Sequence, residues 1–99
     1  MSRLIVVFVA VACLAACRGA PVQEMSDARQ AIDAARDAGA PQRSPTDYNA
    51  AQEAIMRAEA HLQAQEYGRA RMAALEAKRR AAAALANSER ATAAADAKH

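Results

Sequence analysis

The sequence holds 99 residues, enough for one small domain, and 31 of them are alanine. Its hydrophobic content of 54% is therefore largely methyl groups, and three glycines with three prolines are too few for collagen or for a sandwich of short strands. The formal net charge of +2 gives no reason to expect a nucleic acid as a partner. The composition favours an all-α protein.

The first segment of the chain is typical of a secretory signal. Residues 1–3 supply a short cationic start, and residues 4–12 form an uninterrupted apolar run. As a helix, residues 4–17 would be only about 21 Å long, against a bilayer hydrocarbon core of roughly 30 Å. A cleaved signal is therefore favoured over a transmembrane helix. Ordinary signal peptidase has one rival site, at residues 10–12, which falls inside the apolar run.

The end of this segment, Leu14-Ala15-Ala16-Cys17, resembles the lipobox of bacterial lipoproteins. The resemblance implies that the Cys17 thiol receives diacylglycerol, that a dedicated peptidase cuts before it, and that its new amine receives a fatty acid. Residues 1–16 would then be the signal peptide, and residues 17–21 the lipidated N-terminus and a short tether. Cys13 would be discarded with the signal, so the mature chain could form no internal disulfide.

Arg18 follows the lipidated cysteine directly. In the enterobacterial sorting rule, aspartate at this position keeps a lipoprotein in the inner membrane. Arg18 therefore favours the outer membrane, with the protein body facing the periplasm. Several acyl chains, at about 0.8 kcal/mol per buried methylene, would anchor it permanently. We expect no cofactor beyond the covalent diacylglycerol and fatty acid on Cys17.

The first predicted helix covers residues 22–38. Pro21 suits its first turn, because the missing N–H is not needed there. Gly39 and then Pro41 favour an end, since glycine takes the left-handed conformation and proline cannot continue a helix. Apolar residues recur on one face at intervals of three and four, as expected for a helix: Val22, Met25, Ala28, Ile32 and Ala35.

A second helix is predicted over residues 45–64. Ser44 is placed to accept hydrogen bonds from its free N–H groups, Pro45 fits the first helical position, and Asp47 suits the positive end of the helix dipole. The repeating face consists of Tyr48, Ala51, Ile55, Ala58 and Leu62.

A third helix is predicted over residues 66–95, followed by a frayed tail at residues 96–99. Gly68 is the only helix breaker near the expected turn at residue 65, so an unbroken helix over residues 45–95 remains an alternative. The packing face consists of Tyr67, Ala70, Ala74, Ala77, Ala81 and Leu85. Because alanine ends at a methyl group, this seam allows the helix axes to approach closely. Residues 22–95 would thus form a small three-helix hairpin or bundle with alanine-rich seams.

Other side chains of the third helix lie off this seam. Met72 and Leu75 need a second contact, either the first helix or another protein. The opposite side is expected to be solvated, and it carries Arg69, Glu76, Arg80 and Asn87.

The stretch from Glu66 to Ala74, with the pattern E-Y-x-x-A-R-x-x-A, resembles domain-of-unknown-function family 4398. The resemblance extends over residues 22–86 and includes Ser44-Pro45 and the alanines of the second helix. It implies a small alanine-rich envelope protein, often a lipoprotein, whose tyrosine opens a helix that packs back on its predecessor. Relatives usually carry glycine where Gln65 stands, which bears on the sharpness of the turn. The family has no agreed biochemical function.

The sequence predicts neither an active site nor a metal site. His61 and His99 are the only histidines, and they cannot supply the converging ligands that a metal needs. We find no nucleophile–base pair and no phosphate-binding glycine loop, so we expect no enzyme and no small-molecule substrate. The basic run at residues 78–80 spreads around its helix and is typical of ordinary surface.

Two functions are compatible with these features. The first is an adaptor lipoprotein, tethered to the membrane by its lipid, that binds another envelope protein or a second copy of itself through its helix faces. The alternative resembles the murein lipoprotein, a coiled coil that links the outer membrane to peptidoglycan through a terminal lysine. Lys98 suits that role, but His99 follows it, and Gly39, Pro41 and Pro45 interrupt the helix.

Overall fold

The computed structural model describes residues 19–98, and within that range the chain is all-α. Its elements are α2 (Val22–Asp37), α3 (Ala40–Arg43), α4 (Pro45–Gln63) and α5 (Tyr67–Ala97). The predicted all-α fold is confirmed, with the short helix α3 as an unexpected addition. The predicted signal peptide and lipobox lie outside the described residues. Among residues 19–98, no helix combines the length and the hydrophobicity needed to cross a bilayer.

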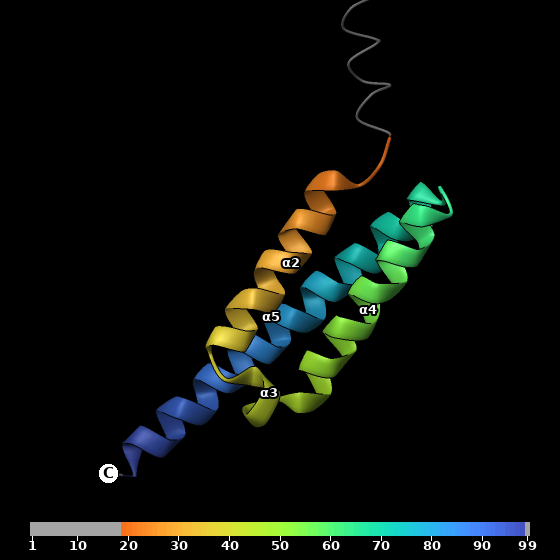
Figure 1. Cartoon of the computed structure of the whole chain (residues 1–99). Coiled ribbons are helices and arrows are strands. Elements are labelled where there is room, and N and C mark those ends of the chain that lie inside the picture. The colour runs from red at the N-terminus through yellow and green to blue at the C-terminus, as the bar shows by residue number, and fades with distance from the viewer. Residues whose placement is uncertain (1–18, 99) are drawn as a thin grey trace, which may run out of the picture.

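Helix α5 runs between α2 and α4 and packs against both (Figure 1). Helix α4 is antiparallel to the other two, and the last turns of α5 continue past α3 (Figure 1). Direct contact between α2 and α4 is much smaller than the contact of either helix with α5. Helix α5 is therefore the element that holds the domain together.

The buried face of α5 repeats at intervals of four and three residues. Every residue on it is fully buried, and five of the six are alanine: Ala70, Ala74, Ala77, Ala81, Ala84 and Ser88. A 3.5-residue repeat keeps one narrow stripe facing the neighbouring helices, as in a coiled coil. The stripe is so small that α2 and α4 can bring larger side chains against it: Met25 and Ile32 from α2, and Tyr48 and Ile55 from α4. The core therefore consists of large side chains of α2 and α4 packed against the alanine methyl groups of α5.

The link between α2 and α4 contains a left-handed glycine and a short helix. Gly39 has a φ of 81°, and its N–H donates to the carbonyl of Arg36 at 3.0 Å. Gly39 is therefore the helix end that the sequence predicts. Pro41 is not part of the stop, because it lies in the first turn of α3, where proline is tolerated.

Ser44 precedes α4, but its side chain makes no capping hydrogen bond, contrary to the sequence prediction. Its Oγ instead accepts a hydrogen bond from Asn87 Nδ2 of α5 at 3.5 Å. The hydroxyl therefore joins two helices rather than satisfying one helix end.

The turn between α4 and α5 is closed by two backbone hydrogen bonds. The N–H of Glu66 donates to the carbonyl of His61 at 2.8 Å, and the N–H of Gln65 donates to that of Leu62 at 3.0 Å. This pair of bonds is the Schellman motif, with Gln65 in the left-handed conformation at a φ of 60°. The alternative of an unbroken helix over residues 45–95 is therefore wrong. Gly68 lies inside α5 with open space around it and does not form the turn.

Candidate functional site

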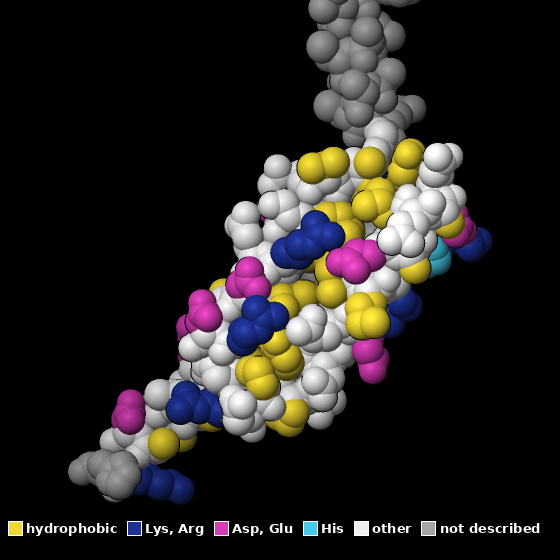
Figure 2. Space-filling model, in the orientation of Figure 1, with side chains coloured by type: hydrophobic (Ala, Val, Ile, Leu, Met, Phe, Trp, Pro, Cys, Tyr) yellow, Lys and Arg dark blue, Asp and Glu magenta, His cyan; other side chains and the backbone are white. Residues whose placement is uncertain are grey.

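A shallow groove lies between α2 and α4 on the face shown in Figure 2. Its volume is about 230 Å³. Ile32 and Ile55 form its apolar base, and both are almost fully buried. The hydrophobic side chains gather along the middle of this face, with charged side chains beside them (Figure 2). The polar lining consists of Arg29, Asp33, Arg36, Gln52 and Glu59.

The polar side chains of the groove bind one another across the two helices. Arg29 Nη2 lies 3.2 Å from Glu59 Oε1, which joins α2 to α4. Tyr48 OH accepts hydrogen bonds from Arg36 Nε and Gln52 Nε2, each at 3.0 Å. The hydrogen bond with Tyr48 is the main reason that the pKa of Arg36 lies above its ordinary value. The groove therefore has a polar surface, and the two isoleucines at its base contribute almost no exposed area.

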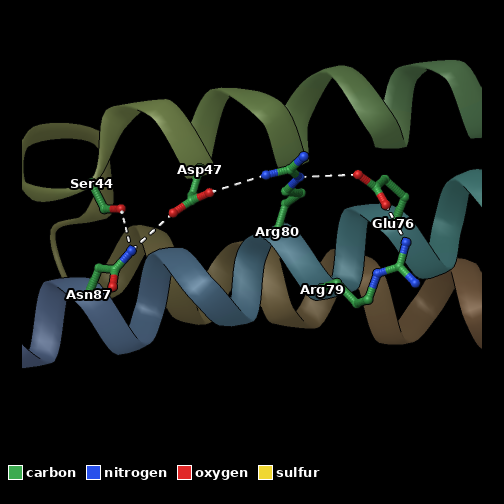
Figure 3. A network of polar contacts seen from close by, with 6 residues as sticks. All are labelled: Ser44, Asp47, Glu76, Arg79, Arg80 and Asn87. Carbon is green, nitrogen blue, oxygen red and sulfur yellow. Dashed lines mark hydrogen bonds and ion pairs between the residues drawn. The ribbon is translucent and has the colours of Figure 1, made fainter.

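A second polar network locks α4 to α5 (Figure 3). Asn87 Nδ2 donates to Asp47 Oδ2 at 3.0 Å, and Arg80 Nη1 lies 3.6 Å from Asp47 Oδ1. Arg80 Nε also donates to Glu76 Oε1 at 3.1 Å, and Arg79 pairs with the other oxygen of Glu76. Hydrogen bonds from Arg79 and then from Arg80 hold the pKa of Glu76 below its ordinary value.

The expectation that Asn87 is solvated is therefore wrong, whereas Arg80 is exposed as expected and also pairs with Asp47. Both side chains reach across to the first turn of α4, since they flank the alanine stripe on its α4 side. Together with Asp47 they connect α5 to the first turn of α4.

The residues before α2 are tied to α5. Arg71 Nη2 donates to the carbonyl of Gly19 at 3.0 Å, and Arg71 Nε donates to Glu24 Oε1 at 3.2 Å. Pro21 is fully buried, and its carbonyl accepts from the N–H of Met25 at 3.0 Å. The predicted tether is thus bound along the domain from Gly19 onward.

Sequence reasoning missed these long-range contacts. Glu24 and Arg71 are 47 residues apart, and a charge pattern along one helix cannot reveal a partner on another. The rest of the α5 seam could have been found, because Ala84 and Ser88 continue the intervals of three and four beyond Ala81.

Six of the nine predicted packing residues are buried, and three are not. The buried ones are Tyr48, Ile55, Ala70, Ala74, Ala77 and Ala81, whereas Leu62 and Leu85 are half-buried. Tyr67 is 36% exposed, because the first residue of α5 lies at the end of the bundle, where α4 has already turned. Val22, the first residue of α2, is 73% exposed, although the sequence places it on the packing face.

Met72 and Leu75 remain exposed on α5, at 67% and 39%. Helix α2 contacts α5 through Glu24–Arg71 and Asp27–Lys78, on the face that also carries Leu75, whereas Met72 lies further round the helix. For Met72, the alternative that the first helix provides the second contact is wrong.

A larger hollow, of about 440 Å³, lies where the C-terminal end of α2 meets α5. Its polar lining consists of Asp37, Arg43, Glu89, Thr92 and Asp96. Within residues 19–98, no three His, Cys, Asp or Glu side chains converge as metal ligands would. The Nδ1 atom of His61 lies 3.5 Å from Glu66 Oε1, so this histidine belongs to the α4–α5 turn.

The model of one protein family, described as domain of unknown function (DUF4398), matches residues 23–99. The match covers α3, α4, α5, all of α2 except its first residue, and the Glu66–Ala74 stretch. Neither the search of curated proteins nor that of solved structures gives a match.

Proposed function

The chain belongs to the DUF4398 family, and on that premise we propose that it is a non-catalytic adaptor lipoprotein of the bacterial cell envelope. In this proposal Cys17 carries the lipid, the outer membrane holds it, and the helical domain faces the periplasm. The observation that carries the proposal is Leu14-Ala15-Ala16-Cys17 at the end of a short apolar run. The helical domain supports it, since α2 begins only five residues after Cys17.

The test of the anchor is the replacement Cys17→Ser. We expect this variant to lose fatty-acid labelling and to accumulate as an uncleaved precursor, because the lipid is attached through the thiol. A matched control is Cys13→Ser, which removes the other cysteine and should leave labelling unchanged. If Cys17→Ser is processed to the same size as the unaltered protein, the lipoprotein assignment is wrong.

The adaptor role rests on the groove between α2 and α4. A photo-crosslinking residue at Asp33, which is exposed and lines the groove, should give a discrete adduct with an envelope protein in intact cells. The matched control is the same residue at Ala82, an exposed position of α5 that does not line the groove. Adducts of equal yield from both positions would argue against the groove as the docking surface.

One observation supports a structural lipoprotein as the second candidate. The last turns of α5 extend past α3, and Lys98 at their end is exposed (Figure 1). A peptidoglycan cross-link at Lys98 would need such an accessible amine. Against this candidate, α2, α4 and α5 fold back on one another, whereas a murein-lipoprotein coiled coil is continuous. Cell-wall peptides attached to Lys98 in digests would decide in its favour.

A further inference from the structure

Large apolar side chains are exposed mainly at one end of the bundle. This end, called the tether end below, comprises the first turn of α2, the α4–α5 turn and the first third of α5. Of the five large apolar side chains that are exposed within residues 19–98, four lie in these segments, and Met56 lies on α4 about as far from the turn as Leu75 does on α5. On the face that Figure 2 draws, hydrophobic side chains lie at the end of the bundle where α2 begins. The four at the tether end are Val22, Tyr67, Met72 and Leu75.

The tether end is also where the chain enters the domain. Arg71 holds the Gly19 carbonyl at 3.0 Å, and the buried Pro21 fixes the chain two residues later. Gly19 follows Cys17 by two residues, which span at most about 7 Å when fully extended. A lipid on Cys17 therefore starts within about 7 Å of Gly19. The domain has no long linker that would let it move away from the membrane or turn freely.

Charge at the tether end is largely neutralised. Arg71 pairs with Glu24 at 3.2 Å, and Arg69 pairs with Glu66 at 3.0 Å. A surface that combines exposed apolar side chains with paired charges fits the headgroup boundary of a bilayer, into which apolar side chains penetrate about 5–10 Å.

We propose that the tether end is a membrane-contact surface, which rests on the phospholipid bilayer and holds the helices in one fixed orientation. The proposal rests on the lipidation of Cys17 proposed above. It places Tyr67 and Met72 at the lipid and the far end of α5, about 45 Å away along a 31-residue helix, in the periplasm. The groove between α2 and α4 then lies at a fixed distance from the bilayer, where partners can reach it. Because the contact is apolar, it should depend only weakly on salt.

The test is a comparison of two spin labels on the lipidated full-length protein in phospholipid vesicles. One label is attached at Met72→Cys and the other at Ala94→Cys, an exposed position about 33 Å further along α5. Collisions with a water-soluble nickel chelate should be lower at residue 72 by roughly threefold or more, because a probe inside the headgroup boundary is shielded from water. Equal collision rates at both positions would overturn the proposal.

Two further measurements separate the possible causes of failure. Incorporation of a fatty acid, measured on the same preparation, reports on Cys17. If no fatty acid is incorporated, the adaptor-lipoprotein proposal fails. If fatty acid is incorporated but the two spin labels have equal collision rates, only the membrane-contact proposal fails. The variant Arg71→Met releases the Gly19 carbonyl and should abolish most of the difference between the two labels. Its control is Lys78→Met, which removes a longer contact with α2, 3.9 Å from Asp27, away from the tether. A full difference retained in Arg71→Met, at normal helicity by circular dichroism, would show that this bond does not set the orientation.

Discussion

The fully buried alanine stripe makes Ala77 the most informative site for a test of the packing. Ala77 lies in the middle of the stripe, where α5 contacts both α2 and α4, and it has no exposed surface. The replacement Ala77→Leu adds three carbon atoms at a point where the neighbouring side chains already rest on a methyl group. The surrounding helices would have to move apart to admit them.

Overpacking of this kind typically costs about 1–3 kcal/mol. In a domain of this size, each 1 kcal/mol lowers the midpoint of thermal unfolding by about 4–8 °C. The expected fall in the melting temperature of Ala77→Leu is therefore between about 4 and 24 °C. The measurement is thermal unfolding of the purified protein in a mild detergent, followed by circular dichroism.

The matched control is Ala82→Leu, the same change on the exposed side of the same helix. It should alter the free energy of unfolding by no more than about 0.5 kcal/mol, since nothing packs on that position. Equal falls in melting temperature for Ala77→Leu and Ala82→Leu would mean that the stripe does not face the other helices. The account of the core would then be wrong.

Three further changes test other features of the fold. Gln65→Gly should raise the free energy of unfolding by up to about 1 kcal/mol in denaturant titrations. A left-handed φ costs a non-glycine residue about 1–2 kcal/mol, and the larger chain entropy that glycine loses on folding offsets part of this gain. A lower free energy of unfolding in this variant would contradict the left-handed turn. Ser88→Ala should be stabilising by roughly 1 kcal/mol, because the buried Ser88 Oγ has no hydrogen-bond partner, and a clear loss would show that it has one. The pKa of Glu76 is lowered in the folded state, so its contribution to stability is present above its ordinary value and lost as the pH falls through the lowered one. Stability measured between about pH 5 and pH 2 should therefore fall less steeply in Glu76→Gln, and identical slopes would show that the arginine contacts of Glu76 do not stabilise the fold.

Side-chain spacing was sufficient to predict the three long helices and most of their buried residues. The intervals of three and four identify the stripe from Ala70 to Ala81, because one face of a helix must be apolar to be buried. Gly39 could be assigned to a left-handed helix end, since glycine occupies that region at no steric cost.

The turns and the contacts between helices could not be predicted in the same way. Gln65 carries no local signal for a positive φ, and the two backbone hydrogen bonds of the turn impose it. The bonds of Arg71 to Gly19 and of Asn87 to Asp47 join residues 52 and 40 positions apart, so they exist only once the helices have packed. Tyr67 fits the periodic pattern, but it is the first residue of α5, where little of a neighbouring helix remains to cover it.

The most direct test of the central claim is the intact mass of the mature protein extracted from bacterial membranes. The claim predicts the mass of a chain that begins at Cys17, increased by a diacylglycerol and a fatty acid. The increase should be located on the N-terminal peptide. A mature chain that begins at another residue, or one that begins at Cys17 without added lipid, would contradict it.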